Sequence, residues 1–195
     1  MQPQLCLNKI NILRAISLVS IAATLVLVVV SIFLGNPIQQ TMSDIGREHR
    51  VWFSFYNAVL GVAIISTIVL CTIRMKYNYT TFWVLFALSM IAFTVQAVVL
   101  GTHDNLAGDI HLRTAQLFGV LMSITGYLLL KFRERYFKTK KFYSNFLLVC
   151  LVVIAALVLL NGGRLTAIMQ YFVLFTGFFP VIMITYVHKL VPSSA

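Results

Sequence analysis

The densest group of residues that could do chemistry lies in the segment 102–113, just before an apolar run. Its histidines and acids are His103, Asp104, Asp109 and His111. A histidine beside a carboxylate can move protons in the cleavage or transfer of a lipid head group. Asp104 and His111 stand seven residues apart, which would place both on one face of a continuous helix. Helix capping and solvated charge at a membrane surface are the alternative interpretation of the same residues.

The same segment also contains the ligand types of a divalent-metal site. Its spacing matches no zinc signature, so no metal ligands are assigned. Haem ligation is disfavoured because the histidines lie at the ends of apolar runs rather than inside opposing runs. The sequence therefore leaves the cofactor unknown, and it leaves open whether the protein is an enzyme.

A second polar group follows the first apolar run and is joined by an arginine before the last run. It consists of Asp44, Arg47, His49, Arg50 and Arg164. Arginine presents several donors in one plane, which suits a phosphate head group. Thr41 and Asp44 have capping-box spacing and predict a short interfacial helix that continues through Arg50 into the second run.

These residues must be positioned by a framework that is mostly apolar. The chain has 195 residues, of which 60% are apolar and 10% charged, and its mean hydropathy is +0.93. Six apolar runs cover about 13–34, 51–73, 81–101, 113–130, 146–161 and 165–187. Each approaches the roughly 17–25 residues that a helix needs to cross a bilayer. The runs lack the alternation of barrel strands, so we predict an all-α polytopic membrane protein with six transmembrane helices in one domain, residues 1–195.

The distribution of basic residues predicts the orientation. The net charge of +10 would suggest a nucleic-acid partner in a soluble protein, but here most of the cations fall on one side of the predicted membrane, and no nucleic acid is predicted. The residues on that side are Lys9, Arg14, Arg74, Lys76, Lys131, Arg133, Arg135, Lys138, Lys140, Lys141 and Lys189. The positive-inside rule then places both termini in the cytoplasm, most simply with the chain in the cytoplasmic membrane.

Four amide side chains lie in the outer halves of the predicted spans. They are Asn57, Gln96, Gln116 and Gln170. Amides in hydrocarbon are costly without partners and usually face a bundle interior or a wet cavity. Their common depth predicts a polar cleft open to the outer leaflet; the alternative is that each amide bridges two neighbouring helices.

The segment 36–46, which reads Asn-Pro-Ile-Gln-Gln-Thr-Met-Ser-Asp-Ile-Gly, follows a first span. It resembles the Pro-Ile-Ser and Ser-x-x-Gly pattern of the membrane family called domain of unknown function 998. The histidine-bearing loop before the fourth span and the Gly163-Arg164 turn before the last span are similar too. Here Gln39 or Gln40 stands where a serine is common. The resemblance implies a six-helix membrane protein and implies no activity or catalytic residues.

We predict that an outward-facing cleft binds a lipid or another amphiphile. Asp44, Arg47, Arg50 and Arg164 would contact the head group, and the amides would line the neck of the cleft. The alternative is a membrane-embedded hydrolase or transferase that acts on lipid head groups through His103, Asp104, Asp109 and His111. A small transporter or an assembly partner of another membrane protein is a further alternative function. For the partners, a homo-oligomer or a complex with another membrane protein is left open. The predicted partners are membrane lipids.

Overall fold

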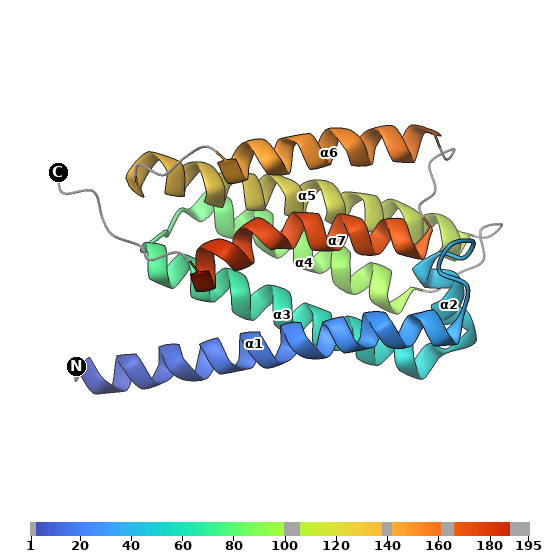
Figure 1. The fold of residues 1–195 in the computed structure, drawn as a ribbon, viewed down its shortest axis with the longest axis horizontal. Coiled ribbons are helices and arrows are strands. Elements are labelled where there is room, and N and C mark those ends of the chain that lie inside the picture. Colours follow the sequence, from blue (N-terminus) through green and yellow to red (C-terminus); the bar gives the residue numbers. More distant parts are fainter. Residues whose placement is uncertain (1–2, 100–105, 138–141, 161–165, 188–195) are drawn as a thin grey trace.

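The chain folds as a bundle of long helices (Figure 1). The structure, a computed structural model, describes residues 3–99, 106–137, 142–160 and 166–187. The helices are α1 (Pro3–Leu34), α2 (Met42–Glu48), α3 (Arg50–Met75), α4 (Thr80–Val98), α5 (Leu106–Phe137), α6 (Phe142–Leu160) and α7 (Ala167–Ile182), followed by the π-helical turn η1 (Met183–Val187). No strand occurs among the described residues, which confirms the predicted all-α class.

Five of the helices are long and apolar enough to cross a membrane. They cover Asn8–Leu34, Arg50–Met75, Thr80–Val98, Leu106–Arg135 and Met169–Tyr186. The apolar part of α6, Phe142–Leu157, is shorter. It corresponds to the shortest of the six predicted runs. Helices α1 and α5 also extend well beyond their predicted runs, because helix continues through their polar ends.

Two antiparallel pairs dominate the packing, α1 with α3 and α4 with α5 (Figure 1). The short helix α2 lies at one end of the bundle, beside the C-terminus of α1 and the N-termini of α3 and α7. We call this the α2 end. The opposite end, where α3 and α5 finish and α6 begins, is called the far end. Every candidate residue of the sequence analysis that the structure describes lies toward the α2 end.

Buried hydroxyl groups join α1 to its neighbours. The Ser17 and Thr67 hydroxyls are 2.7 Å apart at the α1–α3 interface, and both side chains are buried. The Tyr171 hydroxyl of α7 donates to the Ser31 oxygen of α1. Such bonds between apolar helices are satisfied inside the bundle, where they add specificity to packing.

The corner at the α2 end confirms one prediction and corrects another. Thr41 and Asp44 form the predicted capping box: the Thr41 hydroxyl accepts from the Asp44 backbone N–H at 3.1 Å, and Asp44 Oδ2 accepts from the Thr41 N–H at 2.9 Å. The helix does not continue through Arg50, however. It breaks at His49, which has φ −124° and ψ 62°. The break lets α2 lie across the end of the bundle before α3 begins.

Candidate functional site

Two charged residues of the α2 corner, Asp44 and Arg47, pair with each other. Asp44 caps α2 and also forms an ion pair with Arg47, one turn later on the same helix. Asp44 favours the helix N-terminus because its charge complements the helix dipole. Arg50 begins α3 and is exposed. Arg164, predicted to join this group, lies outside the described residues.

Two histidines at the α2 end serve the same structural purpose. The His49 Nε2 lies 2.9 Å from the carbonyl oxygen of Leu34, the last residue of α1. The His111 Nδ1 lies 2.8 Å from the carbonyl oxygens of both Gln96 and Val99, where α4 ends. A carbonyl only accepts, so each ring nitrogen must carry the donated proton. Each histidine therefore satisfies carbonyls that the end of a helix leaves without partners.

The predicted catalytic group is only partly visible. Asp109 is exposed in the first turn of α5, and His111 is held by the end of α4. His103 and Asp104 lie outside the described residues, so the predicted His–Asp pairing remains a prediction. Among the residues that the structure does describe, no three histidines, cysteines or acids gather as a metal site would require.

Replacing His111 by alanine is expected to destabilise the α4–α5 pair by about 1 kcal/mol, because two carbonyls lose their donor. Thermal unfolding in detergent measures this loss. The exposed Gln116 of the same helix supplies the control, and Gln116→Ala should leave stability within about 0.5 kcal/mol. Equal stability of the two variants would show that the His111 bonds contribute nothing.

The four predicted amides do not share one cleft. Gln170 on α7 accepts from the Met42 backbone N–H at 3.3 Å and so ties α7 to α2. Gln116 is exposed on α5, and Gln96 is half-buried near the end of α4. Asn57 alone of the four lines the groove described next. Gln170 is thus closer to the alternative, in which an amide bridges two helices.

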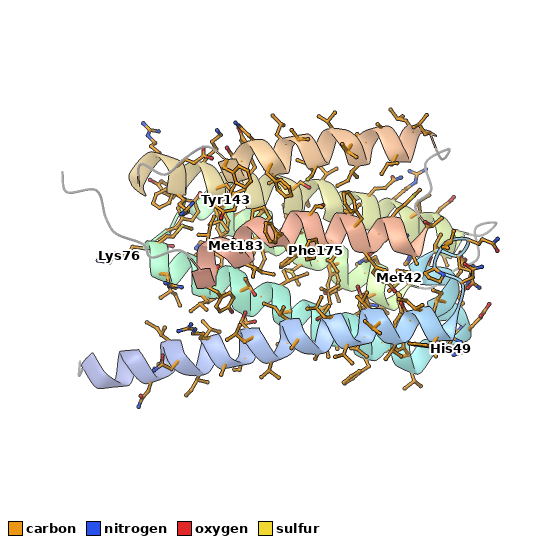
Figure 2. All side chains as sticks on the ribbon, viewed as in Figure 1. Met42, His49, Lys76, Tyr143, Phe175 and Met183 are labelled. Atoms are coloured by element: carbon orange, nitrogen blue, oxygen red, sulfur yellow. The ribbon has the colours of Figure 1, made fainter. Side chains whose placement is uncertain are left out.

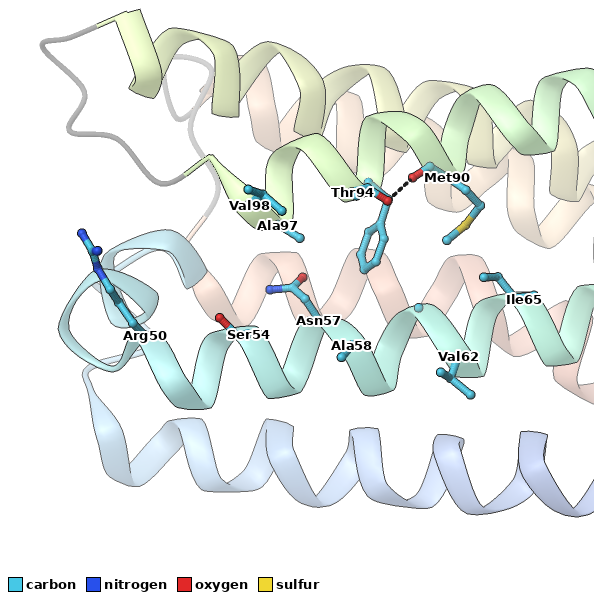
Figure 3. Close-up of a pocket in the computed structure, with 12 residues that line it drawn as sticks. Arg50, Ser54, Asn57, Ala58, Val62, Ile65, Met90, Thr94, Ala97 and Val98 are labelled. Atoms are coloured by element: carbon cyan, nitrogen blue, oxygen red, sulfur yellow. Dashed lines mark hydrogen bonds between the residues drawn. The ribbon is translucent and has the colours of Figure 1, made fainter.

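A groove of about 590 Å³ runs between α3 and α4 toward the α2 end (Figure 3). From α3 it is lined by Arg50, Ser54, Asn57, Ala58, Gly61, Val62 and Ile65, and from α4 by Met90, Phe93, Thr94, Ala97 and Val98. On the α3 wall the polar side chains Arg50, Ser54 and Asn57 lie toward the α2 end, and Val62 and Ile65 lie deeper. The α3 wall therefore changes from cationic and polar at the mouth to apolar at depth, while Ala97 and Val98 of α4 make the opposite side of the mouth apolar.

Small residues of α3, Ala58 and Gly61, line one side of the groove, and the Phe93 ring of α4 bounds the other side. A Cβ on Gly61 would come within 3.2 Å of the Phe93 ring, so this glycine allows Phe93 to pack closely against α3. Asn57 is directed toward α4, and its amide nitrogen donates to the Phe53 carbonyl at 2.8 Å (Figure 3). The Asn57 carbonyl oxygen makes no hydrogen bond to any other described residue. It can therefore accept a hydrogen bond from a ligand.

A second hollow of about 710 Å³ adjoins the groove at Arg50. Its lining is Arg47, Glu48, His49, Arg50, Val51, Trp52 and Phe55. It brings together two of the predicted head-group residues, Arg47 and Arg50, and the predicted ligand-binding residue His49, with exposed apolar side chains such as Val51 and Phe55. Tryptophan, present here as Trp52, is enriched at the water–lipid boundary of membrane proteins.

Comparisons with known proteins add no family. No family model, curated protein or solved structure matches the chain. The resemblance to domain of unknown function 998 thus stays a prediction.

Most residues that line the groove were not among the predicted site residues. Ser54, Ala58 and Gly61 recur on α3 at intervals of three and four residues, as do Met90, Phe93, Thr94 and Ala97 on α4. This spacing marks one face of each helix. Small residues recurring on one face of a membrane helix were the available signal, but they indicate close packing as readily as a ligand groove.

Proposed function

We propose that the protein is an integral membrane protein that binds a lipid or a similar amphiphile in the α3–α4 groove. The acyl chain would lie along the deeper wall, beside Val62, Ile65 and Met90. The head group would lie at the mouth, with Arg50 as its cationic contact and the adjoining hollow beside it. The observation that supports this most is the polarity gradient along the α3 wall of a groove between two helices long enough to cross a membrane.

The apolar wall and the cationic mouth of the groove would each stabilise one part of a bound amphiphile. Apolar walls favour an acyl chain by about 0.8 kcal/mol for each methylene group removed from water, although in a bilayer the chain gains only the better packing of the groove. A guanidinium can donate two parallel hydrogen bonds to one phosphate. Ser54 and Asn57 lie between these two regions and can bond the ester or hydroxyl oxygens of the ligand. Selectivity would therefore come from the mouth of the groove.

The proposal includes a topology. All six long helices, α6 included, would cross the cytoplasmic membrane, with both termini in the cytoplasm. The far end carries Arg74, Lys76, Lys131, Arg133 and Arg135, and the positive-inside rule assigns such an end to the cytoplasm. The groove would then open to the outer leaflet.

Native mass spectrometry of the protein released from lipid nanodiscs tests the proposal. We expect the wild type to retain phospholipid, and we expect Arg50→Gln to weaken retention about threefold or more, since a hydrogen bond to a charged group is lost. Arg113→Gln removes the same charge from an exposed position of α5 at the same end and serves as the matched control. A wild type without retained lipid, or equal losses in both variants, would contradict the proposal.

A further inference from the structure

An arginine at the far end is buried and forms no ion pair with any described residue, although the carboxylate of the next residue, Glu134, lies near enough to act on its charge. Arg133 is 3% exposed and lies near the end of α5. It continues the buried face that Thr125, Leu129 and Leu130 form on the preceding turns. A position that the helix pattern assigns to an apolar side chain is thus occupied by a permanent cation.

The surroundings of Arg133 provide partners for only part of its guanidinium group. Its guanidinium carbon lies 5.6 Å from the centre of the Tyr143 ring, so one face of the cation packs on an aromatic face. Its Nε is buried and makes no hydrogen bond to any described residue. The same end has two more buried polar atoms without a partner in the described part of the chain, Glu134 Oε1 and the Tyr186 hydroxyl.

The protein has few acids that could pair with this cation. The chain contains five acidic residues in all. Asp44 and Glu48 are on α2, and Asp109 is at the start of α5, at the opposite end of the bundle. Asp104 precedes α5 in the sequence. Glu134 alone belongs to the far end, and its Oε2 accepts from Lys131 at 3.1 Å.

A buried cation whose acidic neighbour already accepts from Lys131 is only partly compensated, and an apolar residue of similar size would serve packing better. A buried polar atom that lacks a protein partner calls for an explanation, and a bound ion or water is one of them. Here the missing charge is negative, and a planar guanidinium with an unused N–H matches the oxygen atoms of a phosphate. Exposed cations of the same end, Arg74 and Arg135, would raise the local concentration of anions.

We propose that Arg133 holds a phosphate group at the far end of the bundle, in a second site independent of the α3–α4 groove. The phosphate would belong to an anionic phospholipid of the leaflet at that end or would be free inorganic phosphate. Arg133 donates to its oxygens, and Tyr143 covers the face of the guanidinium. Because the Arg133 side chain is 3% exposed, a phosphate bound to it should exchange slowly and survive purification.

The first test uses the wild-type protein in neutral detergent. Its thermal stability is measured with added phosphatidylglycerol, phosphatidylcholine or inorganic phosphate, and its phosphorus content is measured after extensive washing. We expect phosphorus to remain bound and phosphatidylglycerol to stabilise more than phosphatidylcholine. Stabilisation by inorganic phosphate alone would assign the site to the free ion. Absence of any anion-specific stabilisation would overturn the proposal.

The second test separates Arg133 from the general charge of the far end. Arg133→Gln should weaken the anion-specific effect about tenfold or more, while Arg133→Lys, which keeps the charge but not the fork of donors, should retain part of it. Arg135→Gln removes the same charge from an exposed position on the same helix. This variant should retain nearly all of the anion-specific stabilisation. Equal losses in Arg133→Gln and Arg135→Gln would overturn the site. If Arg133→Gln does not fold, an unchanged anion preference in Arg133→Lys and Arg133→Met would overturn it instead.

Discussion

Ala97→Phe is expected to reduce lipid retention about tenfold, because the new ring occupies the groove between α3 and α4. Ala97 lines the groove on its α4 side, near its mouth (Figure 3). Overpacking a site that a ligand must enter costs about 1–3 kcal/mol, and 1.4 kcal/mol corresponds to a factor of ten in affinity. Native mass spectrometry and competition with a fluorescent phospholipid measure the loss.

The control for this variant lies on the same helix. Ala87 is exposed and is not part of the groove lining. Ala87→Phe therefore adds the same ring to a face that would meet bulk lipid, and retention should stay within twofold of the wild type, about 0.4 kcal/mol. If Ala87→Phe reduced retention as strongly as Ala97→Phe, the bound lipid would belong to the general surface of the bundle.

Gly46→Ala is expected to destabilise the protein by about 1–3 kcal/mol, as overpacking does elsewhere. A Cβ at Gly46 would lie 2.5 Å from Phe53 Cδ2 and 2.6 Å from Phe53 Cγ, and the Phe53 side chain is buried. The ring cannot move without opening the corner between α2 and α3. Because His49 and Arg50 belong to this corner, lipid retention should fall together with the melting temperature.

Gly119→Ala tests whether the effect is specific to the corner. Gly119 lies inside α5, and a Cβ there would meet nothing within 4 Å. Alanine is favoured over glycine in a helix by about 0.5–1 kcal/mol, so this variant should be as stable as the wild type or more stable. A melting temperature of Gly46→Ala equal to that of Gly119→Ala would mean that the corner is looser than described.

The two ends of the bundle, marked in Figure 2 by Met42 and His49 at one end and Lys76 and Tyr143 toward the other, differ in the contacts that hold their side chains. At the α2 end, Met42 and His49 belong to a corner built from backbone-capping bonds. At the far end, Tyr77 packs edge-on against Phe82 and Phe132, with ring centres 5.0 and 4.4 Å away. These contacts secure the connection between α3 and α4 onto α5. The groove lies toward the other end of the α3–α4 pair from these ring contacts.

Much of the architecture could be predicted from sequence because continuous apolar runs leave few alternatives. Six runs predicted six long helices, and each run corresponds to a helix of the structure; five of these helices are long and apolar enough to cross a membrane. The Thr41–Asp44 cap was predictable for the same local reason: it depends on residues three positions apart. The break at His49 was not, because it is stabilised by a bond to Leu34, fifteen residues earlier in the chain.

The functional residues were harder to predict than the helices, because chemical type does not reveal what a side chain contacts. His111 has the chemistry of a general base, yet its ring caps α4. Gln170 and Asn57 lie at similar predicted depths, yet one binds α2 and the other lines the groove. Arg133 was grouped with other basic residues as a determinant of topology. Its burial depends on the packing of α5 against its neighbours, which no local pattern encodes.

Photo-crosslinking tests the groove most directly. The protein is reconstituted with a phospholipid that carries a diazirine in its acyl chain, irradiated, and analysed by peptide mapping. We predict that label concentrates on the groove-facing residues of α3 and α4, such as Val62, Ile65 and Met90, and that excess unlabelled phospholipid displaces it. Label spread evenly over exposed apolar faces, such as Val149 and Val152 of α6, and insensitive to competition would contradict a lipid-binding groove.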